Sequence, residues 1–151
     1  MSSKYSDVKL HINGKWRDAI ATETLDVINP ATEGVIGTVA LARTPDLDEA
    51  LEAANSAFRS WKSVSAFDRY NLMRKAAALL RERVDQIAGI MTLEQGKPIA
   101  ESKIEVAVGA DRIDWMAEEA RRAYGRIIPP RTEGVYQLVV KEPVGPVAAF
   151  T

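Results

Sequence analysis

The first forty residues alternate between short apolar stretches and turn sequences. Asn13-Gly14 separates two short runs in which apolar and polar positions alternate. This is a strong signal for a type I′ β-hairpin, because both central residues of that turn need positive φ angles. A second pair of strands, over residues 24–28 and 35–41, flanks the turn-forming residues 29–34. The N-terminal part of the chain is therefore predicted to be rich in β-strands.

From residue 45 onward, apolar residues recur at every third or fourth position instead of every second. That period predicts amphipathic α-helices, each with one apolar face to bury. Pro45 suits the first turn of the first helix, and Ser65 with Asp68 resembles a capping box at the start of the second. Gly96 is expected to end the second helix. The three predicted helices cover residues 45–61, 65–91 and 99–123.

The C-terminal part is predicted to be extended. Pro129-Pro130 indicates a stiff turn, and residues 136–141 form a predicted strand. Residues 147–150 are apolar without alternation, which is typical of a strand covered on both faces in a parallel sheet. A parallel neighbour needs a crossover of about a dozen residues or more, and none follows. We therefore expect residues 147–151 to begin a doubly wound domain whose remainder is missing, and the sequence to be a fragment.

The composition is that of an ordinary globular protein of one or at most two folded units. The 151 residues are 46% hydrophobic and 27% charged. Twenty basic against 21 acidic residues leave a net charge of −1, which argues against nucleic acid or a membrane surface as a partner. No run approaches the roughly 20 apolar residues of a spanning helix, and the N-terminus lacks the apolar core of a signal peptide. A cytoplasmic location is expected.

Few residues offer catalytic chemistry. The absence of cysteine excludes disulfides, thiolate metal sites and a cysteine nucleophile within these residues. No G-x-G-x-x-G phosphate loop occurs. His11 is the only histidine, so neither a zinc cluster nor a Ser-His-Asp triad can form, and we interpret it as a surface residue of a strand.

Two charged stretches have both a structural and a functional interpretation. The sequence "LEQGKPIAES", residues 93–102, is typical of a solvated helix end, with a functional site as the less favoured alternative. The sequence "DRIDWMAEEARRAYG", residues 111–125, alternates acids and bases. This favours a half-exposed helix with salt bridges over a charged recognition helix.

Three longer motifs, in this order, closely resemble the N-terminal part of the NAD(P)-dependent aldehyde dehydrogenases. They are "INPATEGVIGTV", "LEQGKPIAESKIEV" and "KEPVGPVAAFT", and the resemblance covers the chain from Leu10 onward. Within that superfamily "DWMAEEARRAYGRIIPP" looks most like the succinate-semialdehyde dehydrogenases, followed by enzymes for related dicarboxylic semialdehydes.

The resemblance implies an α/β fold and a division of the chain. It implies a partial doubly wound (Rossmann-like) cofactor domain with N-terminal β-hairpins, three amphipathic helices and a β oligomerisation arm. Residues 1–124 correspond to the N-terminal part of the cofactor-binding domain, residues 125–143 to the arm, and residues 144–151 to the first strand of the truncated sheet. A homo-oligomer, dimer or tetramer, joined through the arm is expected.

The resemblance also implies site residues. Phe150 and Thr151 correspond to residues that line NAD or NADP. Val27 and Ile28, through backbone oxygens, and Glu94, through its carboxylate, correspond to a structural site for a monovalent cation, which prefers such oxygen ligands. Two positions depart from the family pattern: Glu33-Gly34 replaces the usual Gly-Glu, and Glu94 stands where aspartate is common.

The implied reaction is the oxidation of a small aldehyde, succinate semialdehyde or a related acid semialdehyde, to its carboxylate. In the family a cysteine thiolate attacks the aldehyde, hydride passes to the nicotinamide, and a glutamate base assists hydrolysis of the thioester. All these groups would lie beyond Thr151, so we expect no catalytic residue within this chain and no activity from these residues alone. The alternative is a short non-catalytic protein that acts as an assembly partner or inhibitor of a full-length relative.

Overall fold

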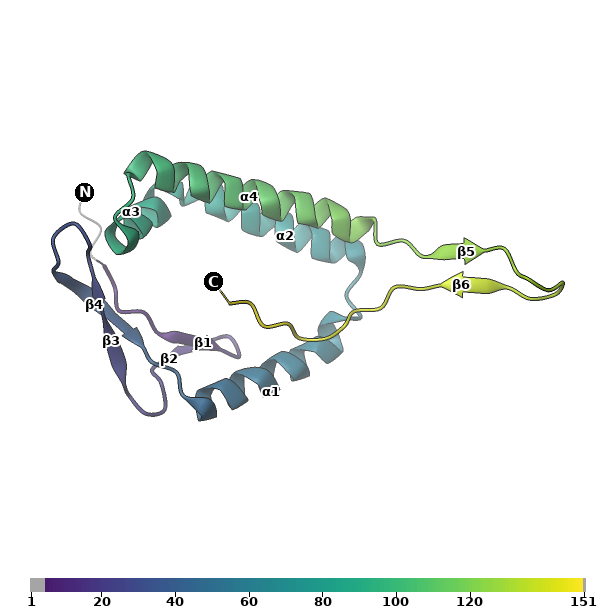
Figure 1. The fold of residues 1–151 in the computed structure, drawn as a ribbon, viewed down its shortest axis with the longest axis horizontal. Helices are drawn as coiled ribbons and strands as arrows, with labels where there is room; N and C mark the ends of the chain where they lie inside the picture. Colours follow the sequence, from purple (N-terminus) through teal and green to yellow (C-terminus); the bar gives the residue numbers. More distant parts are fainter. Residues whose placement is uncertain (1–4, 151) are drawn as a thin grey trace.

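The computed structural model describes residues 5–150 and contains four helices and six short strands in that range (Figure 1). In chain order they are β1 (Leu10–Ile12), β2 (Lys15–Arg17), β3 (Thr24–Ile28), β4 (Val35–Ala40), α1 (Thr44–Trp61), α2 (Ala66–Glu82), α3 (Val84–Gln95), α4 (Ile99–Arg121), β5 (Arg126–Ile128) and β6 (Gln137–Val139). The first two hairpins lie at one end of the molecule, α2 and α4 run side by side, and β5–β6 projects from the opposite end.

The two N-terminal hairpins are confirmed. Strands β1 and β2 pair antiparallel around Asn13 and Gly14, whose φ angles of 50° and 75° are those of a type I′ turn. Strands β3 and β4 also pair antiparallel, with an irregularity in register between Val27 and Ile28. The six strands form three separate two-stranded sheets within the described residues.

The prediction of three helices is wrong in one respect, because the second predicted helix is two helices. The Ser65 hydroxyl accepts a hydrogen bond from the Asp68 N–H at 3.0 Å, which confirms the predicted start of α2. The chain then leaves helical geometry at Arg83, with φ −100° and ψ 14°. No glycine or proline marks this point, and the break allows both α2 and α3 to contact α4.

Small residues form the core between the helices. Ala77 of α2, Ala88 of α3, and Ala110 and Ala117 of α4 have no exposed surface. Larger apolar side chains face outward, among them Leu79, which is 37% exposed, and the half-buried Val84 and Ile87. These apolar side chains are therefore only partly covered within residues 5–150. No helix among residues 5–150 is long and apolar enough to cross a membrane.

The C-terminal part differs from the sequence prediction. The predicted strand over 136–141 appears as the shorter β6, and it pairs antiparallel with β5, which was not predicted. Residues 147–150 form no strand, because no neighbouring strand among the described residues pairs with them. The doubly wound sheet is therefore not seen within residues 5–150 and stays a prediction.

A buried carboxylate connects the first hairpin to α1. Asp46, with a side chain 1% exposed, lies in the first turn of α1. Its Oδ1 accepts hydrogen bonds from Arg17 Nη1 at 2.8 Å and from the Ile20 N–H at 3.0 Å, and its Oδ2 accepts one from the Arg43 N–H at 3.0 Å. Hydrogen bonds, above all that from the Arg43 N–H, lower the pKa of Asp46 although burial acts in the opposite direction.

We expect Asp46→Asn to lower the melting temperature by several degrees, because an amide cannot accept all three hydrogen bonds and leaves Arg17 without its buried partner. Asp48→Asn, at an exposed position of the same helix, is the matched control and should leave the melting temperature nearly unchanged. Equal effects of the two substitutions in thermal unfolding would contradict this role of Asp46.

The same carboxylate should make stability depend on pH. Because the folded-state pKa of Asp46 lies below the unfolded value of about 3.9, its stabilisation is complete well above that pH and is lost as the pH falls through about 4 towards the folded pKa. Urea unfolding between pH 6 and pH 3 should therefore show a smaller loss of stability for Asp46→Asn than for the unsubstituted protein. Parallel curves for the two proteins would refute the lowered pKa.

Candidate functional site

The predicted cation ligands Val27 and Ile28 flank a β-bulge. Val27 pairs with Gly37, but Ile28 pairs with Val35, so Ile36 has no partner in β3. A bulge of this kind interrupts the regular ladder of backbone hydrogen bonds and is common beside functional sites. The residue without a partner is Ile36 of β4, which lies opposite Val27 and Ile28, while these two residues keep their pairing with β4.

The turn after β3 approaches the end of α3, where Glu94 lies. Asn29 closes this turn: its N–H donates to the Gly34 carbonyl at 2.9 Å and its Oδ1 accepts from the Ala31 N–H at 2.9 Å. Pro30 packs against Gly96, so closely that a Cβ on the glycine would lie 2.7 Å from Pro30 Cγ. Two segments about 65 residues apart in sequence are thus brought together.

A residue that the sequence analysis did not single out holds the Glu94 carboxylate. The Tyr5 hydroxyl donates a hydrogen bond to Glu94 Oε1. Burial, followed by this hydrogen bond, raises the pKa of Tyr5 to about 12. A single tyrosine in the polar N-terminal segment belongs to no periodic pattern or motif, so the sequence carries no signal for this contact.

The donor set fits a monovalent cation better than a transition metal. Among residues 5–150 no group of three or more His, Cys, Asp or Glu side chains is placed to hold a metal ion. Carboxylate and backbone oxygens are hard ligands of the kind that alkali cations prefer. The carboxylates of Glu94 and Asp7 have no ion-pair partner within the described part of the chain, so negative charge around Tyr5 is not neutralised.

The predicted cofactor-lining residues lie on a different segment. Phe150 is 94% exposed, and Thr151 lies outside the described residues. Just before them, residues 145–147 lie against the last turns of α1, where they line a hollow of about 230 Å³ together with Ala54, Ala57, Phe58 and Trp61. The segment that leads to Phe150 therefore lies beside the last turns of α1.

Apart from Glu94, residues of the two charged stretches form contacts within and between the helices. Lys97 pairs with Glu105, and the buried Ser102 lies 2.9 Å from the Thr92 hydroxyl. On α4, Asp111 and Asp114 both pair with Arg81 of α2, at 2.6 and 2.8 Å.

His11 is an exposed strand residue whose ring packs against Trp16 at a centroid distance of 4.6 Å. None of these residues adds to the candidate site.

Comparison with known proteins identifies the family of this chain. Residues 16–151 match the aldehyde dehydrogenase family. The chain belongs to this family. NAD or NADP is the cofactor typical of the family.

Two curated relatives and one solved structure illustrate the match. The chain is 45% identical to the 4-(hydroxymethyl)benzenesulfonate dehydrogenase TsaD1 of Comamonas testosteroni, over 97% of this chain and 31% of the relative. It is 41% identical to the succinate-semialdehyde dehydrogenase [NADP(+)] GabD of Escherichia coli, over 93% of this chain and 29% of the relative. The crystal structure of succinate-semialdehyde dehydrogenase from Burkholderia pseudomallei superposes with a TM-score of 0.89 at 37% identity, over 91% of this chain and 29% of that one. The chain thus spans less than a third of the length of each.

We expect Gly96→Ala to lower the free energy of unfolding by about 1–2 kcal/mol, because Gly96 has a φ of +78° and its Cβ would clash with Pro30. Gly109→Ala is the matched control: this helical glycine faces open space, and alanine should stabilise α4 by about 0.5–1 kcal/mol. Chemical denaturation of both variants checks the pair. A neutral Gly96→Ala would show that the turn and the end of α3 are not held together as described.

Proposed function

We propose that the protein containing this chain is an NAD(P)-dependent aldehyde dehydrogenase that oxidises succinate semialdehyde or a related acid semialdehyde to the carboxylate. The observation that carries the proposal is the family match over residues 16–151, together with the likeness to succinate-semialdehyde dehydrogenases in both sequence and structure.

This chain supports the reaction without supplying its nucleophile. It contains no cysteine, so the thiolate that attacks the aldehyde must come from outside residues 1–151. NAD or NADP, when bound, accepts the hydride. The role that we propose for Phe150 and Thr151 is to line the dinucleotide, and the contact of residues 145–147 with α1 supports it by placing this segment. Residues 1–151 alone should therefore be inactive.

We also propose that Val27, Ile28 and Glu94 hold a structural monovalent cation. Support comes from the bulge at Val27 and Ile28, from the packing of Pro30 on Gly96, and from a Glu94 carboxylate without an ion-pair partner among the described residues. The two backbone oxygens and the carboxylate belong to segments that this packing brings together.

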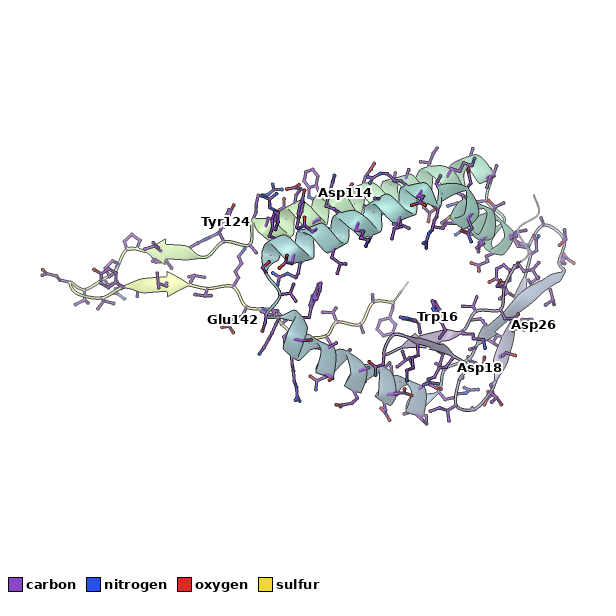
Figure 2. The ribbon with its side chains drawn as sticks, turned by 180° about the vertical axis from the view of Figure 1, so that it is seen from behind. Trp16, Asp18, Asp26, Asp114, Tyr124 and Glu142 are labelled. Atoms are coloured by element: carbon purple, nitrogen blue, oxygen red, sulfur yellow. The ribbon has the colours of Figure 1, made fainter. Side chains whose placement is uncertain are left out.

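The arm of residues 125–143 is our proposed contact between subunits of a homo-oligomer. Figure 2 shows Tyr124 and Glu142 at the base of the β5–β6 hairpin, where it leaves the helices. Ile127, Tyr136 and Leu138 on the hairpin are 82%, 90% and 67% exposed, and a two-stranded hairpin with bare apolar side chains is at most marginally stable alone. A second copy of the chain would bury this surface.

The same exposed hairpin, in a stretch without cysteine, also favours the alternative of a short non-catalytic partner or inhibitor of a full-length relative. A larger dehydrogenase subunit that co-purifies with a 16.6 kDa chain would support that alternative. An enzyme in which this chain continues into a catalytic cysteine segment would exclude it.

The full-length protein should reduce NAD or NADP in the presence of succinate semialdehyde, followed by absorbance at 340 nm. Because an acid-binding site rejects analogues without the acid group, we expect kcat/KM for succinate or glutarate semialdehyde to exceed that for butanal by at least about tenfold. The aldehyde 4-sulfobenzaldehyde serves as a second test substrate, because one relative is a 4-(hydroxymethyl)benzenesulfonate dehydrogenase. A preference for it would overturn the proposed substrate but leave aldehyde oxidation as the reaction. Absence of aldehyde-dependent reduction would overturn both.

Leu138→Asp should weaken subunit association by at least about tenfold, because it would bury an unpaired carboxylate in the contact. Gln137→Asp places the same charge on the opposite face of β6 and serves as the control, with a smaller effect expected. Sedimentation velocity over a range of protein concentrations measures the change. An unaltered oligomer in Leu138→Asp would remove the hairpin from the interface.

A further inference from the structure

The segment around Tyr5 is held along the free edge of β4. The Val8 N–H donates to the Thr38 carbonyl at 2.7 Å, and the Ala40 N–H donates to the Val8 carbonyl at 2.9 Å. Asp7 Oδ1 accepts a hydrogen bond from the Thr38 N–H at 2.9 Å. These three bonds place residues 5–8 beside β4, in a short parallel pairing of Val8 with Val39.

The Tyr5 ring occupies a space that only glycine can leave open. A Cβ on Gly37 would lie 2.5 Å from Tyr5 Cδ1 and 2.8 Å from Cε1, closer than real side chains approach. Gly37 does not have a positive φ angle, so the ring, rather than the backbone conformation, requires glycine there. Gly37 is also the pairing partner of Val27, beside the bulge.

Tyr5 therefore connects the strand pair that carries Val27 and Ile28 with the carboxylate of Glu94. Its ring lies on the strand pair that carries Val27, and its hydroxyl donates to Glu94 Oε1. Within residues 5–150 the Glu94 carboxylate accepts one hydrogen bond, and Oε1 is the atom that accepts it. The other carboxylate oxygen, Oε2, can therefore bind a cation. Asp7 adds a second negative charge near the ring.

We propose that Tyr5 is a positioning residue of the cation site: it holds the Glu94 carboxylate beside the β3–β4 bulge, so that Glu94 and the backbone oxygens of Val27 and Ile28 act on one monovalent cation. This inference rests on the proposed cation site. Tyr5 lies in the N-terminal segment, before residue 16, where the match to the family model begins.

The test is thermal unfolding of the full-length protein in K⁺ or Na⁺, with choline chloride at equal ionic strength as the reference. The unsubstituted protein should gain stability with K⁺ or Na⁺ in a saturable manner. Tyr5→Phe keeps the ring on Gly37 and removes only the hydroxyl. It should raise the half-saturating cation concentration about tenfold, and Glu94→Gln should abolish saturable stabilisation.

Two further variants sharpen the result. Gly37→Ala, which displaces the ring, should raise the half-saturating concentration at least as much as Tyr5→Phe. Tyr124→Phe makes the same chemical change at an exposed tyrosine beyond α4 and should leave that concentration unchanged. A purely structural role of Tyr5 would lower the melting temperature in choline but leave the half-saturating concentration as it was.

The outcomes separate the two proposals. Unchanged cation dependence in Tyr5→Phe, with loss in Glu94→Gln, would overturn the role of Tyr5 and leave the cation site standing. Unchanged dependence in Glu94→Gln would place the cation elsewhere. Absence of saturable stabilisation in the unsubstituted protein would overturn the cation site and the role of Tyr5 together, without bearing on the aldehyde oxidation.

Discussion

The buried Asp46 carboxylate is the contact from which the arrangement of the N-terminal half follows. Through three hydrogen bonds it joins the end of β2, the loop at Ile20 and the first turn of α1. Arg17 also pairs with Glu49 of α1 at 2.6 Å, so its guanidinium holds two carboxylates of the helix and the direction of α1 depends on this junction. The last turns of α1 in turn receive residues 145–147. Helix α1 thus links the N-terminal hairpin, at its first turn, with the segment leading to Phe150, at its last turns.

The helix layer depends on a different constraint, the small size of the residues between its members. Alanines of α2, α3 and α4 are fully buried, whereas Leu72 and Trp115 are 55% and 67% exposed. Small residues at the contact permit a short distance between helix axes, and Arg81 with its two aspartates adds ion pairs along the same contact. The large apolar side chains that the amphipathic pattern alone would bury are instead exposed within residues 5–150.

Short-range signals predicted most of the local structure. The type I′ turn at Asn13-Gly14 and the cap at Ser65 involve residues within four positions of one another, and both occur as predicted. The break at Arg83 could not be predicted, because no glycine or proline marks it and the contacts of α2 and α3 with α4 join residues far apart in sequence. The strand expected at 147–150 needs a partner, and apolar character alone does not create one.

In the candidate site, too, some residues can be predicted from sequence motifs and others only from the folded structure. A family motif points to Val27, Ile28 and Glu94, because these positions can be read within continuous stretches of sequence. Tyr5 reaches Glu94 across 89 positions, and its ring fits only because residue 37 is glycine. Neither Tyr5 nor Gly37 predicts this contact from its own position in the sequence. The contact can be recognised only when the structure places β4 beside the end of α3. A sequence comparison limited to residues 16–151 would retain the glycine and omit the tyrosine that makes it necessary.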